Sequence, residues 1–179
     1  MQHYGLANVW DTGDIVTRGI LIDVPAHRGV PWLEPREGVR PAELDAIVSA
    51  RGLDVRPGDA LLLRTGYGAR VSAQGHDRIR AAGRAGWHAA ALPWLRRHDV
   101  SLIATDTATD MSPSGYPAVR NPVHLVGIVA MGLWIVDNCN LERLAATCAD
   151  LGRYEFMLVV APLSFEGATG SPVNPLAIF

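Results

Sequence analysis

Two residues stand out for chemistry, a histidine and an aspartate on either side of an apolar stretch, His124 and Asp137. A neutral imidazole and a carboxylate suit Zn or Mn as ligands, and both groups can transfer protons near neutral pH. The residues alone leave two interpretations open. Either the pair binds a metal, or His124 stands at a helix start and Asp137 is hydrogen bonded to a neighbouring loop.

A second candidate site lies upstream, where Asp106 and Thr107 lie at the carboxyl end of the third predicted strand. Ligands of α/β proteins gather at the carboxyl ends of strands, so Thr107 could contact a substrate and Asp106 could act in acid–base catalysis. The alternative is that Asp106 closes the strand as an Asx-turn or a helix cap. Both interpretations stay open.

Further polar residues occur in a Gly-rich segment and beside a tryptophan. The glycines of segment 167–174 permit close approach of the backbone to a ligand, and Ser171 and Asn174 could bind a carbonyl group there. His88 is either an acid–base group or a core histidine with one ring nitrogen hydrogen bonded. His3 is expected to be an exposed terminal residue.

Composition limits the class of protein. The chain has 179 residues, of which 49% are hydrophobic, and a net charge of −2. This is enough for one substantial core, and the interspersed charges give no cationic surface for nucleic acid or an anionic membrane. No apolar run reaches the roughly 18 residues that span a bilayer, and the N-terminus lacks a signal-type pattern, so we expect a cytoplasmic protein.

The absence of lysine from the sequence excludes several chemistries. Schiff-base catalysis, pyridoxal phosphate attachment and a Walker-type phosphate site all need an amine that this chain lacks. Proton transfer must therefore rest on His, Asp, Glu, Tyr or Cys. The two cysteines, Cys139 and Cys148, form no Cys-x-x-Cys pair and are expected to be reduced, structural thiols. The Gly-x-Ser-x-Gly, dinucleotide-binding and HExxH signatures do not occur.

Apolar runs and helical spacing predict alternating strands and helices, and hence a mixed α/β layer fold. The predicted strands are 18–24, 60–63, 100–104, 133–136, 156–161 and 176–179. The predicted helices are 41–52, 87–98 with Pro93 near its start or at a kink, 123–131, and 141–150 with Asn140 as its N-cap. The uninterrupted run 156–161 indicates burial on both faces. Segment 67–86 is weakly periodic and is expected to be a mobile excursion.

Several segments together resemble a known family. They are Val55-Arg-Pro-Gly-Asp59 with the strand that follows it to Gly66, Ser101 to Thr107, Asn121-Pro-Val-His124, Ile135-Val-Asp137-Asn138 and Gly170-Ser-Pro-Val-Asn174-Pro. They resemble the cyclase family that includes kynurenine formamidase and isatin hydrolase, from about Asp14 to Phe179. The resemblance implies a swivelling β/β/α fold with a mixed, barrel-like central sheet flanked by helices, as a single domain over 1–179 that is shortened at its N-terminus.

The resemblance also implies a metal site, with His124 and Asp137 as ligands to Zn or Mn. In relatives the acid is usually Glu and lies one position earlier. Members open with His-x-Gly-Thr-His-x-Asp-x-Pro-x-His, and this motif does not occur here. Asp23-Val-Pro25-Ala-His27 matches only its tail, because the two leading histidines are replaced by Thr17 and Leu21.

Three hypotheses for function follow. The first is a metal-dependent hydrolase of the kynurenine formamidase type that cleaves a C–N bond in an amide, formamide or lactam, with further ligands from an upstream segment, a second chain or a neighbouring subunit. The second is a metal-free enzyme for cyclisation, dehydration or rearrangement, with His88, Asp106 and Asp137 as acid–base groups. The third is a non-catalytic binding or partner subunit. A small-molecule substrate is expected for the enzymes, and a homo-oligomer or a completing second chain in every case.

Overall fold

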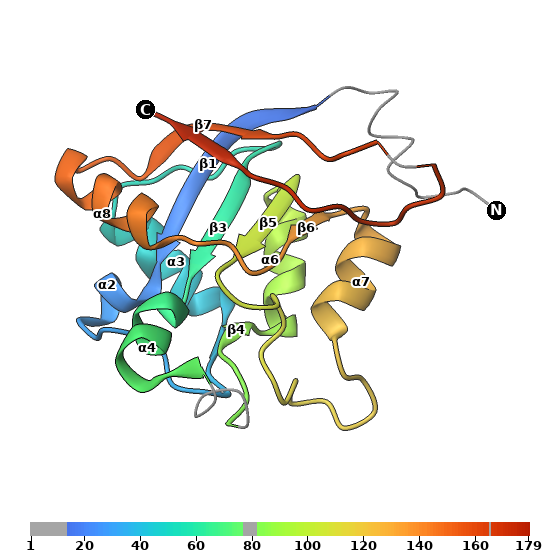
Figure 1. The fold of residues 1–179 in the computed structure, drawn as a ribbon, viewed down its shortest axis with the longest axis horizontal. Helices are drawn as coiled ribbons and strands as arrows, with labels where there is room; N and C mark the ends of the chain where they lie inside the picture. The colour runs from blue at the N-terminus through green and yellow to red at the C-terminus, as the bar shows by residue number, and fades with distance from the viewer. Residues whose placement is uncertain (1–13, 77–81, 165) are drawn as a thin grey trace.

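The computed structural model describes residues 14–76, 82–164 and 166–179, and its centre is a six-stranded sheet (Figure 1). The strand order is β6-β5-β3-β1-β7-β8. Neighbours among β1, β3, β5 and β6 run parallel, whereas β7 and β8 run antiparallel to their neighbours. The strand bounds are Ile15–Asp23 (β1), Ala60–Arg64 (β3), Leu102–Thr105 (β5), Trp134–Val136 (β6), Glu155–Val160 (β7) and Leu176–Ile178 (β8).

Helices connect these strands and flank the sheet, which confirms the predicted mixed α/β fold. Their bounds are Val24–Arg28 (α2), Pro41–Ala50 (α3), Tyr67–Gln74 (α4), Ala89–Ala91 (η1, a 3-10 helix), Leu92–Arg97 (α6), Pro122–Met131 (α7) and Glu142–Leu151 (α8). A small parallel pair, Gly38–Val39 (β2) and Gly86–Trp87 (β4), lies outside the main sheet. Among the described residues, no helix combines the length and apolarity needed to span a membrane.

The central strands are buried on both faces, because side chains alternate between the two sides of a sheet. Ile20, Leu61 and Ile103 pack into one apolar cluster, with α3, α6 and α7. Leu21 and Leu62 point the other way, into a second cluster that α8 covers. The two clusters hold the parallel strands rigidly between two layers.

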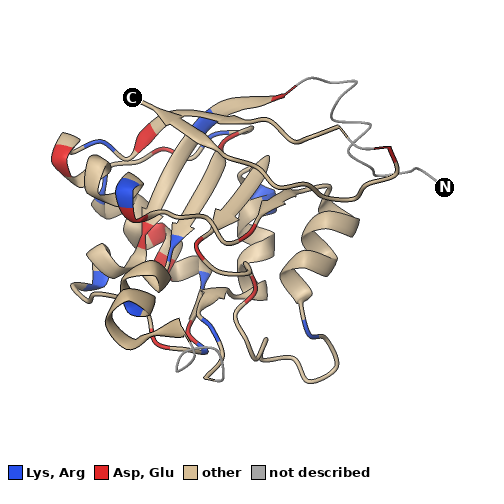
Figure 2. Ribbon diagram, viewed as in Figure 1, with Lys and Arg blue, Asp and Glu red and all other residues tan. Residues whose placement is uncertain are grey.

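The parallel strands bring polar side chains to one edge of the sheet. Since β1, β3, β5 and β6 run in the same direction, their carboxyl ends meet there. β1 ends at Asp23, Asp106 follows β5, and Asp137 follows β6. In Figure 2, acidic and basic residues lie in loops, on helices and near strand ends, while the middle of the sheet is almost free of them. The fold thus places the candidate residues at the edge expected for a site.

Several local predictions are wrong. Trp87 lies in strand β4 rather than in the predicted helix 87–98, whose helical part begins with η1 at Ala89. Residues 67–74 form α4 rather than a mobile excursion, because the Asp106 carboxylate accepts hydrogen bonds from the backbone N–H groups of Gly66 and Tyr67, where the helix begins. Residues 77–81 lie outside the described part of the chain. Strand β7 is buried on one face only, since Met157 is 45% exposed between the buried Phe156 and Leu158. Antiparallel strands commonly leave one face to solvent.

The N-cap prediction for the last helix is off by one residue. α8 begins at Glu142 with Leu141 as its N-cap, and Asn140 lies one position earlier. The Asn140 side-chain oxygen still accepts a hydrogen bond from the Glu142 N–H, at 3.3 Å. Gly152 closes the helix in the left-handed conformation.

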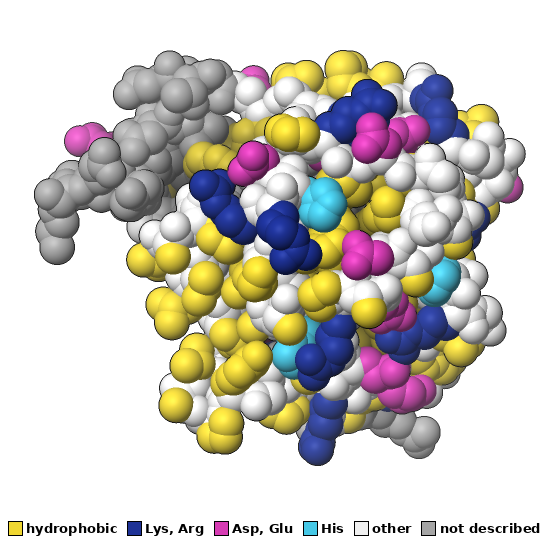
Figure 3. All heavy atoms as spheres, turned by 180° about the vertical axis from the view of Figure 1, so that it is seen from behind, with side chains coloured by type: hydrophobic (Ala, Val, Ile, Leu, Met, Phe, Trp, Pro, Cys, Tyr) yellow, Lys and Arg dark blue, Asp and Glu magenta, His cyan; other side chains and the backbone are white. Residues whose placement is uncertain are grey.

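Helix α7 carries an apolar outer face. Val123 and Gly127 face the core, while Leu125, Ile128 and Val129 are exposed, and no residue between Pro122 and Met131 is acidic or basic other than a histidine. Hydrophobic side chains gather on the left of Figure 3, where α7 lies in that reversed view. A helix that is apolar all round is normally covered on all sides. Nothing within the described residues covers this outer face.

Two matched substitutions test whether this face is free in solution. Val123→Ala should lower the free energy of unfolding by about 2 kcal/mol, because Val123 is 1% exposed and a cavity would remain. Val129→Ala should change it by less than about 0.5 kcal/mol, because Val129 is 69% exposed. Chemical denaturation measures both. An equal loss in the two variants would mean that the face is covered in solution, as the expected self-association would cover it.

Candidate active site

The candidate site is a row of three side chains in which an imidazole lies between two carboxylates. Nδ1 of His124 is 2.6 Å from an oxygen of Asp110, and Nε2 is 3.1 Å from an oxygen of Asp137. His124 lies in the first turn of α7, and Asp137 directly follows β6. The structure thus brings together the two residues that the sequence singled out and adds a third that it did not.

Asp110 is buried and binds the start of α7. Its carboxylate accepts hydrogen bonds from the backbone N–H groups of Val123 at 2.7 Å and His124 at 3.2 Å. The N-cap residue of α7, Asn121, makes no such side-chain bond itself. Asp110 therefore caps the helix from a distant loop, and the same carboxylate holds the imidazole.

Asp137 is held from its other side by a hydroxyl group. Thr109 Oγ1 donates a 2.5 Å hydrogen bond to the second carboxylate oxygen of Asp137. Thr109 has φ +48° and Asn138, next to Asp137, has φ +56°, both in the left-handed region that non-glycine residues rarely adopt. Backbone strain of this kind clusters at functional sites.

The two carboxylates favour the charged imidazolium. Hydrogen bonds from His124 to Asp110 and then to Asp137 raise the pKa of His124 to about 9. Partial burial by itself would raise the pKa of Asp137, but hydrogen bonds from His124 and Thr109, with the nearby charges of His124 and Arg84, lower it. At neutral pH the described site therefore contains a protonated His124 and an ionised Asp137.

These residues do not form a complete metal site on their own. The two ring nitrogens of His124 point in different directions, so Asp110 and Asp137 cannot both join this imidazole around one ion. Within the described ranges there is no group of three His, Cys, Asp or Glu side chains placed to hold a metal. Structural and catalytic zinc sites use three or four protein ligands. The Zn or Mn prediction for His124 and Asp137 therefore stays a prediction.

Asp106 lies at the same sheet edge, but its carboxylate oxygens already accept hydrogen bonds from neighbouring protein groups. Its buried carboxylate accepts hydrogen bonds from the Thr65 backbone N–H and hydroxyl, the latter at 2.7 Å, and from the N–H groups of Gly66 and Tyr67. Burial raises the pKa of Asp106, and these hydrogen bonds oppose that change. The arrangement matches the helix-cap alternative, while its predicted catalytic role stays untested.

Thr107 and His88 are also buried. The Thr107 hydroxyl donates to the backbone oxygen of Ala85 at 3.0 Å. His88 Nδ1 accepts a hydrogen bond from the Ala90 N–H at 3.0 Å, and burial, with the charge of Arg40, lowers the pKa of His88. Neither residue is among the described hydrogen-bond partners of His124 or Asp137. The structure therefore does not join them to the row.

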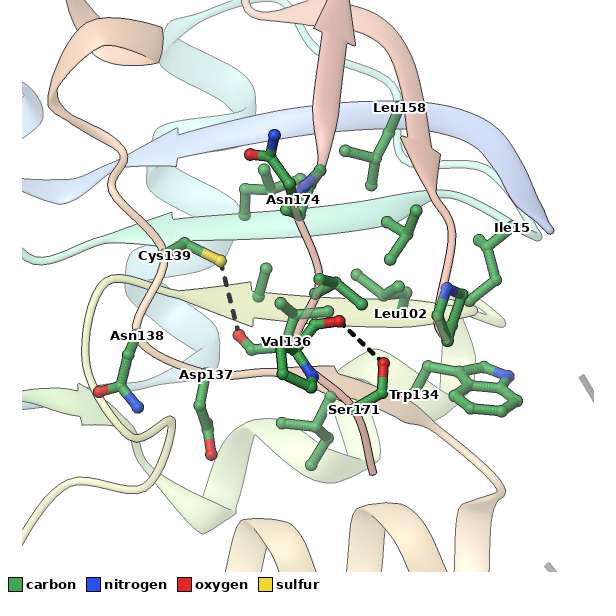
Figure 4. A pocket seen from close by; sticks show the side chains of 18 of the residues that line it. Ile15, Leu102, Trp134, Val136, Asp137, Asn138, Cys139, Leu158, Ser171 and Asn174 are labelled. Atoms are coloured by element: carbon green, nitrogen blue, oxygen red, sulfur yellow. Dashed lines mark hydrogen bonds between the residues drawn. The ribbon is translucent and has the colours of Figure 1, made fainter. Parts of the chain in front are cut away.

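A pocket of about 600 Å³ lies beside the row, on the sheet face that α8 covers (Figure 4). Leu62, Leu102 and Leu158 form part of its lining from the sheet, and the segment before β8 contributes Ser171 and Asn174. The Ser171 hydroxyl accepts from the Leu163 N–H and donates to the Pro172 carbonyl. Asp137 borders the pocket, but Figure 4 shows its side chain pointing away from Leu102 and Leu158.

Sequence reasoning missed Thr109 and Asp110. A signal was present, since Asp110 is the second acid in Asp106-Thr-Ala-Thr-Asp110, directly after a predicted strand. Nothing in that spacing indicates that Asp110 bonds to a helix starting twelve residues later. His3, predicted to be an exposed terminal residue, lies outside the described residues.

The raised pKa of His124 predicts a pH-dependent stability. Because the folded-state value of about 9 exceeds the ordinary value of 6.5, the stabilisation is fully present below about pH 6.5 and is lost as the pH rises through 9. His124→Asn should therefore lower the free energy of unfolding by roughly 2 kcal/mol near pH 6, after allowance for solvent screening, and by much less near pH 10. Denaturant titrations of both proteins at the two pH values measure this. A pH-independent difference would contradict the imidazolium assignment.

Replacement of Asp106 should affect stability strongly. Asp106→Asn puts an amide nitrogen among backbone and hydroxyl donors, and we expect a loss of about 3 kcal/mol in the free energy of unfolding. Asp54→Asn serves as the control, since Asp54 is an exposed acid paired with Arg56 and should give no measurable change. Thermal or chemical denaturation distinguishes the two. A fully stable Asp106→Asn protein would show that the carboxylate is not needed as an anchor.

Known structures share this fold. A crystal structure described as a novel cyclase has 29% identity and a TM-score of 0.85, and the match covers 98% of this chain and 56% of that one. Isatin hydrolase A from Labrenzia aggregata, bound to benzyl benzoate, has 21% identity and a TM-score of 0.71, with 90% and 60% covered. A potential metal-dependent hydrolase with cyclase activity has 16% identity and a TM-score of 0.60, with 98% and 68% covered.

The chain thus spans about 56 to 68% of the length of these three structures. The comparison with curated proteins gave no match. The family model described as "Putative cyclase" matches residues 3–110, which is more than half of the chain. With the fold and the matched segment in agreement, the chain belongs to the cyclase family.

Proposed function

We propose that this chain acts in a hydrolase that cleaves the C–N bond of an amide, formamide or lactam, and that Asp110, His124 and Asp137 are the part of its active site described above. The observation that carries the proposal is the 3.1 Å contact between His124 and Asp137 at the carboxyl ends of the parallel strands. Structural neighbours named isatin hydrolase and metal-dependent hydrolase support hydrolysis as the reaction class.

The side chains suit the proton transfers that this reaction needs. Water adds to the carbonyl carbon, the C–N bond breaks, the nitrogen takes up a proton to become an amine, and the acyl carbon becomes a carboxylic acid; in a lactam both groups stay on one ring-opened product. An ionised Asp137 can accept a proton from the attacking water, and a protonated His124 can donate one to the leaving nitrogen. The described residues do not complete a metal site, so any ligands to Zn or Mn beyond His124 and Asp137 belong to parts not described here.

The pocket that Asp137 borders is the proposed place for the apolar part of the substrate, with the scissile C–N bond at the Asp137 end. A volume of about 600 Å³ falls within the usual range for small-molecule sites, and its lining is largely apolar. None of its lining residues is Arg, Lys or His, so it suits an uncharged molecule better than an anion. Thr107, Ser171 and Asn174 remain proposed substrate contacts, and of these Ser171 and Asn174 line this pocket.

A second candidate function is favoured by the hydrogen bonding of the His124 ring. Both nitrogens of His124 bond to carboxylates, which is the arrangement of an acid–base pair that works without an ion. A metal-free cyclisation, dehydration or rearrangement would use this pair. The two functions differ in their dependence on metal and in whether water is consumed.

An assay with simple substrates tests the first proposal. Isatin supplies a lactam and formanilide a formamide, each tested with added Zn²⁺ or Mn²⁺ and with a chelator. His124→Asn and Asp137→Asn should each lower kcat by roughly 100-fold or more, as expected for loss of an acid–base group, while Asp54→Asn should leave the rate unchanged. A mixture of the wild-type protein and substrate monitored by mass spectrometry shows whether one water is added.

The outcomes separate the hypotheses. Hydrolysis that the chelator abolishes supports the metal-dependent enzyme with ligands from outside the described residues. A product of unchanged or reduced mass that forms in the presence of chelator supports the second function. Wild-type protein that is inactive under every condition, or His124→Asn protein as active as wild type, would overturn the hydrolase proposal.

A further inference from the structure

Two adjacent residues, Thr109 and Asp110, each hold one member of the His124–Asp137 pair. The Thr109 hydroxyl donates to Asp137 at 2.5 Å, and the Asp110 carboxylate bonds to His124 Nδ1 at 2.6 Å. A single short loop therefore sets the positions of both groups. Any displacement of this loop would move the imidazole and the carboxylate together.

The loop is held in a conformation that its sequence does not favour. Thr109 is β-branched, is fully buried and has φ +48°, which is a rare conformation for such a residue. The Trp87 N–H donates to the Thr109 carbonyl at 2.8 Å, and the Met111 N–H donates to the Trp87 carbonyl at 3.2 Å. These two hydrogen bonds to the Trp87 backbone hold the turn in its strained conformation.

Asp110 has more contacts than a helix cap needs. Its bonds to the N–H groups of Val123 and His124 would by themselves cap α7, at 2.7 and 3.2 Å. The third bond, to the ring at 2.6 Å, fixes the imidazole relative to the same helix turn. With Nδ1 directed to a side chain that is 1% exposed, only Nε2 faces Asp137 and the more exposed side.

We propose that Asp110 is a positioning residue for His124, held by the strained turn at Thr109, so that Nε2 is the nitrogen that reacts. The assignment of a reaction to His124 rests on the proposed function, whereas the orientation of the ring does not. It holds for either candidate function, because proton transfer and metal binding would both use Nε2. Outer-shell partners of reacting histidines commonly have this effect.

Nuclear magnetic resonance of protein labelled with ¹⁵N-histidine tests the orientation without any substrate. A short N–H···O⁻ bond should give a slowly exchanging, strongly downfield proton on Nδ1 of His124 in the wild-type protein. Asp110→Ser should abolish this signal, because serine carries no carboxylate and its side chain is shorter. Asp110→Asn keeps the size of the side chain and should weaken the signal. His124→Asn identifies the resonance.

Substitutions at Thr109 separate the two bonds of the loop. Thr109→Ser keeps the hydroxyl and should keep the ring signal of His124. Thr109→Val keeps the branched shape and removes only the bond to Asp137, so the Nδ1 proton should persist while the Nε2 resonance shifts. A ring signal in folded Asp110→Ser and Asp110→Asn proteins that matches wild type would overturn the positioning role. If the serine variant does not fold, the asparagine variant gives the result.

Kinetics then distinguish this inference from the proposed function. If hydrolysis is found, Asp110→Ser should lower kcat on the order of 10- to 100-fold with KM changed less than twofold, because the substrate pocket is untouched. A protein with the expected Nδ1 signal but no activity would remove the hydrolase proposal and leave the positioning of the ring intact. A variant that loses the signal but keeps full kcat would refute the claim that this orientation matters to the reaction.

Discussion

The candidate site depends on one buried carboxylate that serves a helix and an imidazole at once. Asp110 bonds to the first turn of α7 and to the ring of His124, which lies in that turn. Burial excludes water from competing for these bonds, and a charged acceptor makes them stronger than neutral ones. The position of His124 is therefore tied to the docking of α7. A change that loosens the helix start should also loosen the site.

Two aspartates, Asp106 and Asp137, each follow one of two neighbouring parallel strands, but their tertiary contacts differ and suit them to different roles. Asp106 follows β5 and is surrounded by N–H and O–H donors of residues 65–67. Asp137 follows β6, at the edge of the sheet, where among the described residues Thr109 and His124 are its hydrogen-bond partners and a third of its side chain is exposed. The first is therefore suited to hold the loop after β3, and the second remains accessible for chemistry.

The membership of the cyclase family fits a site that is incomplete within the described residues. The chain corresponds to 56 to 68% of the length of three similar structures, and it supplies one histidine and one aspartate in contact rather than a closed set of ligands. The apolar outer face of α7 points the same way, because a face of that kind is normally covered. That further polypeptide completes this site and covers this face stays a prediction.

The sequence by itself determined the alternation of strands and helices and two of the three candidate residues, His124 and Asp137. Apolar runs predicted β3, β5 and β7, and helical spacing predicted α3. The segments around His124 and Asp137 placed one at a helix start and the other after a strand. These features depend on local patterns of burial and backbone preference, which a linear sequence records.

Only the tertiary structure decided the rest. Helix α4 forms although its periodicity is weak, because the Asp106 carboxylate, which follows β5, accepts hydrogen bonds from the N–H groups of Gly66 and Tyr67 at the helix start. β7 has one exposed face because of its place in the strand order, which no local pattern specifies. Asp110 meets His124 because a strained turn and a helix start are brought together across the sheet edge. Such contacts join residues far apart in the chain, so their geometry depends on the packing of the whole domain.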